Sequence, residues 1–127
     1  MRLLLDTHIL IWAAADELPH AAQRHIDDMS NTLLFSPASL WEIVIKAGLG
    51  RDDFDIDPVL LYNGLIASGY EEMPVLTRHV LSVASLPPLH KDPFDRILLA
   101  QAVSEGISFL TADKALAAYP GSVVFVG

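Results

Sequence analysis

The sequence predicts an α/β fold in which a central, mainly parallel sheet lies between layers of helices. Short apolar runs alternate along the chain with longer segments whose apolar residues recur at helical spacing. The first run, Arg2–Asp6, has three consecutive leucines, as is typical of a strand that is covered on both faces. Parallel strands joined by right-handed helical crossovers place their carboxyl ends along one edge of the sheet, where ligands bind.

Helix-capping and helix-breaking residues indicate where the helices and strands of the first half begin and end. Thr7 can cap a helix that follows the first strand, and Pro19 stands where a first helical turn tolerates proline. Asn31 interrupts the apolar spacing of the second helix, and Gly48 stands at the end of the third. We therefore expect a strand over 2–6, helices after 7 and from 19 to about 30, a strand over 33–36 and a helix over 37–48.

The second half follows the same alternation. A polar loop over 50–53 separates the third helix from one that starts at Pro58, and a short helix from Thr77 stops before two consecutive prolines. Pro93 starts a long apolar helix that ends at Gly106. The remaining expected elements are a helix over 58–69, a strand over 107–110, a short helix over 112–118 and a terminal strand over 123–126.

Composition narrows the class of protein. The 127 residues fit one domain, 1–127, and 52% hydrophobic with 19% charged residues describes an ordinary globular chain. The absence of cysteine excludes disulfides, zinc–thiolate sites and thiol catalysis. No signal peptide is legible, and no apolar run reaches the ~18 residues that span a bilayer, so we expect a cytoplasmic protein.

The net charge of −8 argues at first sight against a nucleic-acid partner, because such proteins usually carry a basic patch. Two arrangements remove the conflict. Metal ions can bridge acidic side chains to phosphate, or a basic partner can cover the acids. The net charge alone does not decide between these two arrangements.

Acidic residues gather near the predicted ligand-binding edge. Asp6 directly follows the three leucines of the first strand, and Asp113 follows the strand over 107–110 by three residues. Glu42 lies in the middle of the third helix among apolar neighbours, where an unpartnered charge is rare. Asp92 and Asp95 begin the helix that precedes the strand over 107–110.

Each of these acids also has a simple structural interpretation. Asp6 could be a turn residue, Asp113 could cap the last short helix, and Asp95 could favour the positive end of a helix dipole. Asp92 precedes Pro93 as an N-cap residue would. Taken together, however, carboxylates crowded at one edge repel one another and call for a counter-ion. Mg²⁺ or Mn²⁺ accepts oxygen ligands and can activate water for phosphodiester cleavage.

Four motifs then identify a family. The segments LLLDTHILIW, ASLWEIVIK, LPPLHKDPFDRILLAQA and FLTAD, in this order, resemble PIN-domain proteins and most closely the VapC-type toxins of bacterial toxin–antitoxin pairs. The resemblance covers essentially the whole chain and implies a PIN-like three-layer α/β/α sandwich. The family's acidic quartet falls on Asp6, Glu42, Asp95 and Asp113, while Asp92 is an extra acid that caps or assists.

The resemblance also implies an activity and partners. PIN-domain toxins of this type are expected to be Mg²⁺- or Mn²⁺-dependent endoribonucleases that form homodimers and are silenced by a co-expressed antitoxin. A chain at −8 suits an antitoxin with a basic tail. The alternative is a catalytically silent PIN-like module whose acids bind only a basic peptide of a partner.

Several further residues stay open between two roles. Thr111 could hydrogen-bond a metal-bound carboxylate or cap a turn. His8 and His90, beside the acidic motifs, could touch the chemistry or only form hydrogen bonds. Trp12 and Trp41 are expected in the core, although an aromatic side chain near a cleft could stack a base. The basic residues that flank the acidic motifs could steer phosphate, but as single charges they are expected in solvent: Lys46, Arg51, Lys91 and Arg96. The histidines expected at the surface are His20, His25 and His79.

Two other enzyme classes of similar size fit less well. A response-regulator receiver needs an acidic pair after its first strand, a central phosphoacceptor aspartate and a late lysine. Here Asp6 stands alone, and the second strand leads into Ser36. A phosphatase of the haloacid dehalogenase type needs Asp-x-Asp after the first strand, but the second of those positions is His8.

Overall fold

A five-stranded parallel sheet forms the centre of the protein, as predicted. The computed structural model describes residues 1–88, 91–119 and 121–127, and in this part of the chain the strand order is β3-β2-β1-β4-β5. The order places the first strand in the middle, with crossovers to both sides. The strands are β1 (Arg2–Leu5), β2 (Thr32–Phe35), β3 (Glu71–Glu72), β4 (Ser108–Thr111) and β5 (Val123–Phe125).

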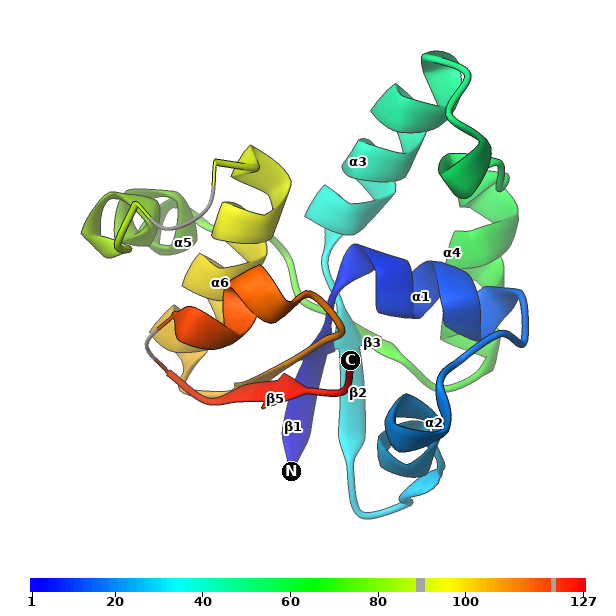
Figure 1. Ribbon diagram of the computed structural model, residues 1–127, viewed down its shortest axis with the longest axis horizontal. Coiled ribbons are helices and arrows are strands. Elements are labelled where there is room, and N and C mark those ends of the chain that lie inside the picture. Colours follow the sequence, from blue (N-terminus) through cyan, green and yellow to red (C-terminus); the bar gives the residue numbers. More distant parts are fainter. Residues whose placement is uncertain (89–90, 120) are drawn as a thin grey trace.

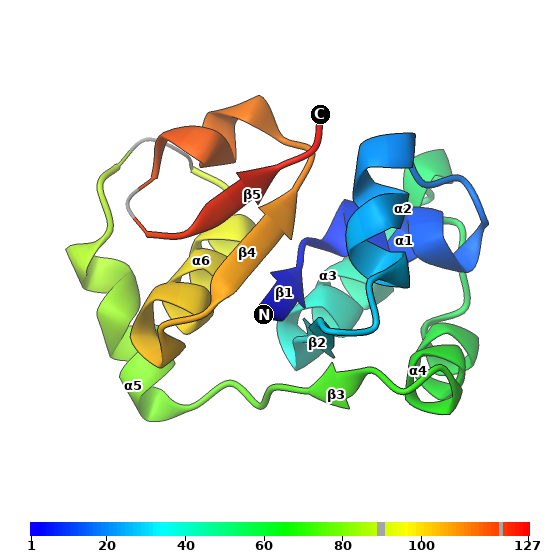
Figure 2. The ribbon, with the colours of Figure 1, turned by 90° about the horizontal axis from the view of Figure 1, so that it is seen from below.

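Helices cover both faces of this sheet, which confirms the three-layer sandwich. Figure 2 shows α5 and α6 on one side of the strands and α1, α2 and α4 on the other. The helices are α1 (Thr7–Ala14), α2 (His20–Asp27), α3 (Pro37–Gly48), α4 (Pro58–Ala67), α5 (Thr77–Ser82) and α6 (Pro93–Glu105). Short 3-10 turns are η1 (Asp52–Phe54), η2 (Val83–Ser85) and η3 (Lys114–Ala118).

The leucines of β1 explain why the sheet is buried on both faces. Successive side chains of a strand point to opposite faces. Leu3 and Leu5 pack in one hydrophobic cluster with α1 and α4, and Leu4 packs in a second cluster with α6. All three side chains are fully buried, so the continuous apolar run is the sequence signature of a central strand.

Helices begin where strands end, and this positions the functional edge. α1 and α3 start at the upper, carboxyl ends of β1 and β2 (Figure 1). Ser36 caps α3 by accepting a hydrogen bond from Ala38 N, and Pro37 occupies the first turn. Asp92 caps the start of α6 in the same way, and Gly106 follows its last residue with a φ of 66°, which suits glycine.

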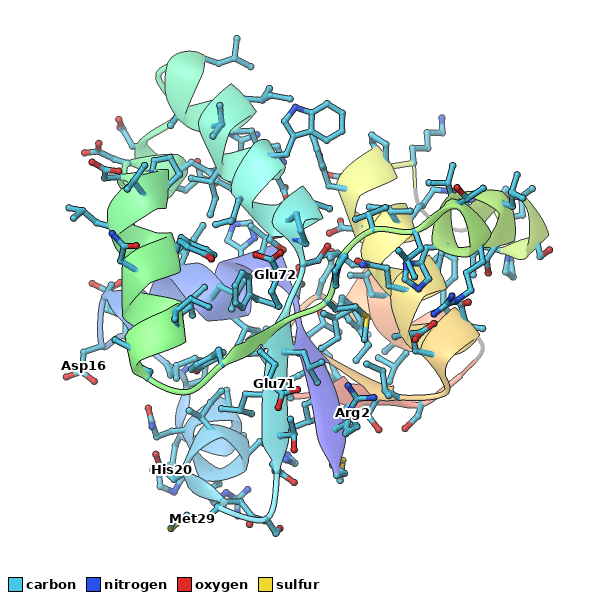
Figure 3. The ribbon with its side chains drawn as sticks, turned by 180° about the vertical axis from the view of Figure 1, so that it is seen from behind. Arg2, Asp16, His20, Met29, Glu71 and Glu72 are labelled. Atoms are coloured by element: carbon cyan, nitrogen blue, oxygen red, sulfur yellow. The ribbon has the colours of Figure 1, made fainter. Side chains whose placement is uncertain are left out.

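Several local predictions were wrong. Thr7 does not cap α1: it is the first helical residue, and its hydroxyl donates to Ser39 Oγ at 3.0 Å. α2 ends at Asp27, and Met29 is 99% exposed rather than part of the helix face. Figure 3 shows Met29 projecting away from the fold between α2 and β2. Strand β3 (Glu71–Glu72) was not predicted, because two exposed glutamates carry no apolar pattern.

The burial of two side chains is the reverse of the prediction. Trp41, expected in the core, is 62% exposed on α3 and packs edge-on against Phe94. His79, expected at the surface, is buried: its Nε2 lies 3.1 Å from Glu105 Oε2, and its Nδ1 accepts a hydrogen bond from Leu76 N. Both errors arise because tertiary neighbours, not helix position alone, decide burial.

None of the described helices is long and apolar enough to cross a membrane.

Candidate metal centre

An acidic cavity of about 360 Å³ opens at the carboxyl edge of the sheet. Carboxylates from four parts of the chain face it: the exit of β1, the middle of α3, the start of α6 and the exit of β4. The described residues that line it are Asp6, His8, Trp12, Glu42, Lys46, Asp92, Asp95, Ala112 and Asp113. The structure thus brings together all five acids that the sequence singled out.

Thr111 joins the two strand exits. Its hydroxyl donates to Asp6 Oδ2 at 2.7 Å and accepts from Asp113 N at 3.0 Å. The Asp113 side chain in turn accepts from Ala115 N at 2.9 Å and so caps η3. Asp6 is only 4% exposed, and its side chain makes no capping hydrogen bond to α1. Thr111 therefore orients the carboxylate of Asp6, and this carboxylate does not cap α1.

Glu42 is buried to 2% exposure and is held by Lys46 one helical turn later. Lys46 Nζ donates to Glu42 Oε2 at 2.7 Å, whereas Glu42 Oε1 has no hydrogen-bond partner among the described residues. Burial alone would lower the pKa of Lys46, but the hydrogen bond and charge of Glu42 outweigh burial and raise it. An orphaned, buried carboxylate oxygen is costly and is the kind of atom that a cation satisfies.

Asp92 and Asp95 have different positions at the start of α6. Asp92 Oδ1 accepts from Phe94 N at 2.8 Å and from Asp95 N at 3.3 Å, so Asp92 is the N-cap. Its other oxygen lies 3.6 Å from Lys46 Nζ. Asp95 lies in the first turn of α6 and lines the cavity.

The crowding of carboxylates shifts their acidity. Burial, followed by the charges of Asp6, Asp92, Glu42 and Asp113, raises the pKa of Asp95 to about 8. Burial also raises the pKa of Asp6, and the Thr111 hydrogen bond partly opposes that rise. A nearby divalent cation would reverse both effects, since it favours the ionised forms.

Aromatic side chains surround the acids. His8 contacts the rings of Trp12 and Phe54, with centroids 5.9 and 5.2 Å away, and its Nε2 lies 3.7 Å from Asp53. Trp12 is half-buried at the edge of the core. His90, the second histidine that the sequence singled out, lies outside the described residues.

Two basic residues expected in solvent have structural partners instead. Lys46 is 17% exposed and lines the cavity. Arg96 donates to the carbonyl oxygens of Pro87 and Val83. The four-residue spacing of Glu42 and Lys46 was the signal that could have placed Lys46, because residues at that spacing are neighbours on a helix.

The donor set fits a hard divalent cation, although the side chains do not form a finished cage. Among the described residues, no three His, Asp or Glu side chains are arranged as a group that could hold an ion as they stand. The Glu42 carboxylate accepts a hydrogen bond from Lys46, and the Asp92 and Asp113 carboxylates accept hydrogen bonds as helix caps. Among the described residues that line the cavity, the possible ligands are carboxylate oxygens and one imidazole, which suit a hard cation better than a soft metal.

The fold and the site define a class of α/β proteins in which acids from strand exits and helix starts surround one cavity. The PIN domain family model matches residues 3–122, and the chain belongs to the PIN-domain family. No curated protein sequence matches this chain.

Solved structures share the fold at low sequence identity. They include a chain of VapBC2 from Rickettsia felis bound to a DNA fragment from their promoter, with 15% identity and a TM-score of 0.74. A chain of DNA-bound VapBC from Salmonella typhimurium has 17% identity and a TM-score of 0.71, and one of VapBC-1 from nontypeable Haemophilus influenzae has 16% and 0.65. In each case the alignment covers 98% of both chains.

Proposed function

We propose that this chain is a metal-dependent endoribonuclease and the toxin component of a toxin–antitoxin pair. The observation that carries the proposal is the cavity itself, in which five carboxylates meet a single lysine. A cluster with this excess of negative charge is stable only with protons or cations bound. Glu42 adds a buried oxygen that has no hydrogen-bond partner in the described part of the chain, and this oxygen favours a bound cation over protons alone.

Asp6, Glu42, Asp95 and Asp113 are the residues proposed to hold Mg²⁺ or Mn²⁺. A bound ion of this kind supplies water of lowered pKa and stabilises charge on phosphodiester oxygens. Thr111 keeps Asp6 oriented through its 2.7 Å hydrogen bond. Asp92 contributes the helix cap that places Asp95 at the mouth of the cavity.

The substrate assignment follows from charge. A chain at −8 with an acidic site has little to hold a phosphate backbone by itself, so bound metal is proposed to bridge acids and phosphate. The family relationship supports RNA as that substrate. His8 and Trp12, at the cavity wall, offer ring faces of the kind on which bases stack.

The partner assignment rests on the structural neighbours and on the same charge. Those neighbours include VapBC complexes and a toxin–antitoxin complex from Klebsiella pneumoniae. We assign this chain a cognate antitoxin with a basic tail that enters the acidic cavity, where arginine suits carboxylates through bidentate hydrogen bonds. The proposal treats residues 1–127 as one PIN domain and includes a cytoplasmic location and a homodimer.

The test compares RNA with DNA and separates ligands from neighbours. End-labelled single-stranded RNA and DNA of one sequence are incubated with the wild type, Asp6→Asn and the control Asp27→Asn, in Mg²⁺. Asp27 is an exposed acid at the end of α2, outside the cavity lining, and it accepts a hydrogen bond from Gln23. Internal RNA cleavage by the wild type and Asp27→Asn, lost in Asp6→Asn, is expected. Binding of a basic peptide without any cleavage would favour the silent interaction module instead.

A further inference from the structure

Lys46 is the sole lysine or arginine among the described residues that line the acidic cavity. Its stem and ammonium are held from several sides. Nζ lies 4.9 Å from the ring centroid of Phe54 and 5.9 Å from that of Phe94. These rings come from η1 and from the start of α6, so three separate segments fix the position of one ammonium group.

The ammonium contacts two of the five acids unequally. It donates to Glu42 Oε2 at 2.7 Å and stands 3.6 Å from Asp92 Oδ2. The remaining oxygen of Glu42, Oε1, is buried and has no hydrogen-bond partner within residues 1–88, 91–119 and 121–127, although Lys46 holds the other oxygen of the same carboxylate. A carboxylate held in this way offers one defined oxygen, not two, to a further ligand.

We infer that Lys46 is a positioning residue of the metal site: it grips one oxygen of Glu42 and presents the other to the divalent cation. This inference rests on the proposed function, because it needs a cation in the cavity. The lysine takes the role that an outer hydrogen-bond partner takes for a metal ligand, in which removal of the partner weakens metal binding.

Electrostatics alone predicts the opposite sign. Removal of a positive charge beside an acidic cluster strengthens cation binding through Coulomb interaction. A positioning role weakens it, because Glu42 loses its fixed orientation. The direction of change in metal affinity therefore distinguishes the two roles, without any measurement of RNA cleavage.

The experiment measures Mn²⁺ affinity by electron paramagnetic resonance of free Mn²⁺ in the wild type, Lys46→Met and Lys114→Met. Lys114 is exposed beside Asp113 and is not part of the cavity lining, so its variant removes the same charge nearby. We expect Lys46→Met to weaken Mn²⁺ binding by about 10-fold and Lys114→Met to leave it equal or tighter. Binding by Lys46→Met as tight as in Lys114→Met would overturn the inference.

A double-mutant cycle tests whether Lys46 acts through Glu42. In a Glu42→Gln background, Lys46→Met is expected to cause no further weakening, whereas a second loss of about 10-fold would contradict the inference. The double variant Glu42→Gln/Lys46→Met has no unpaired buried charge at these two positions. It can therefore be measured even where Lys46→Met alone does not fold.

Conservative rescue provides an independent readout. Lys46→Arg keeps the charge, can stack on both rings and should bind Mn²⁺ more tightly than Lys46→Met. Equal weakening in both would contradict the proposed grip. Equally tight Mn²⁺ binding by the wild type and by Asp95→Asn would instead refute the metal site, and hence the proposed function, independently of the role of Lys46.

Discussion

Thr111 donates a 2.7 Å hydrogen bond to Asp6, which joins two residues 105 positions apart in sequence at neighbouring strand exits. The bond is buried, and the same hydroxyl accepts from Asp113 N. One side chain thus links two of the proposed metal ligands. The arrangement exists because β1 and β4 are adjacent parallel strands, with Leu5 opposite Leu110.

Loss of this hydrogen bond should shift the pH dependence of activity. Thr111→Val keeps the shape but removes the donor, so the pKa of Asp6, already raised by burial, rises further. Asp6 then ionises, and binds metal, only at higher pH. We expect the pH–rate profile of RNA cleavage to move upward and the rate at neutral pH to fall by about 10-fold. Thr111→Ser is the control and should behave as wild type; unchanged profiles in all three proteins would contradict the role of Thr111.

Asp95 should make the metal-free protein less stable as pH rises. Its pKa is about 8 in the folded chain against a usual value of 3.8, because of burial first and neighbouring carboxylates second. Between these values the folded state binds a proton that the unfolded state does not, so the contribution of Asp95 to stability falls as pH increases. Asp95→Asn removes this dependence.

Thermal unfolding in EDTA at pH 5 and pH 8 measures the effect. We expect the melting temperature of Asp95→Asn to exceed that of wild type at pH 8 by roughly 5 °C or more, with a smaller difference at pH 5. Parallel pH dependence in the two proteins would show that Asp95 ionises normally.

Asp92 should matter less than Asp95. Asparagine caps helices about as well as aspartate, so Asp92→Asn keeps the start of α6 in place. We expect cleavage by Asp92→Asn within about 3-fold of wild type, and a loss of about 100-fold or more in Asp95→Asn. The measurement is steady-state RNA cleavage at saturating Mg²⁺. Equal losses in the two variants would refute this division of roles.

The sequence predicted the sheet and the grouping of acids because both follow from local patterns. Three consecutive leucines before Asp6 indicate a buried parallel strand, and the edge at which such strands end is fixed by right-handed crossovers. Pro58 and Pro93 mark first helical turns, and both helices begin there in the structure.

The errors concern residues whose surroundings come from distant segments. Lys46 looked like a solvated charge, since the rings of Phe54 and Phe94 that flank it are remote in sequence. His79 is buried because Glu105, 26 residues later, lies beside it. Trp41 stays 62% exposed although its ring packs edge-on against Phe94 of α6. Spacing within one helix could have indicated the Glu42–Lys46 pair, but it contains no information about contacts between separate segments.

The proposed antitoxin should bind through charge and apolar contacts together. Inhibition of RNA cleavage by the basic partner should weaken when salt rises from about 0.05 to about 0.5 M, but should not vanish, because buried contacts are screened less. Titration of the purified pair at several salt concentrations measures this. An inhibitor that binds the Asp6/Asp95/Asp113 triple Asn variant as tightly as wild type would show that the cavity acids do not hold it.

Metal dependence of RNA cleavage tests the central claim most directly. Purified protein is stripped with EDTA, assayed on single-stranded RNA, and assayed again after excess Mg²⁺ or Mn²⁺ is restored. Because the cavity offers almost only carboxylate oxygens, we predict no cleavage after stripping and full recovery on addition of either ion. Full RNase activity in the presence of EDTA would contradict the account.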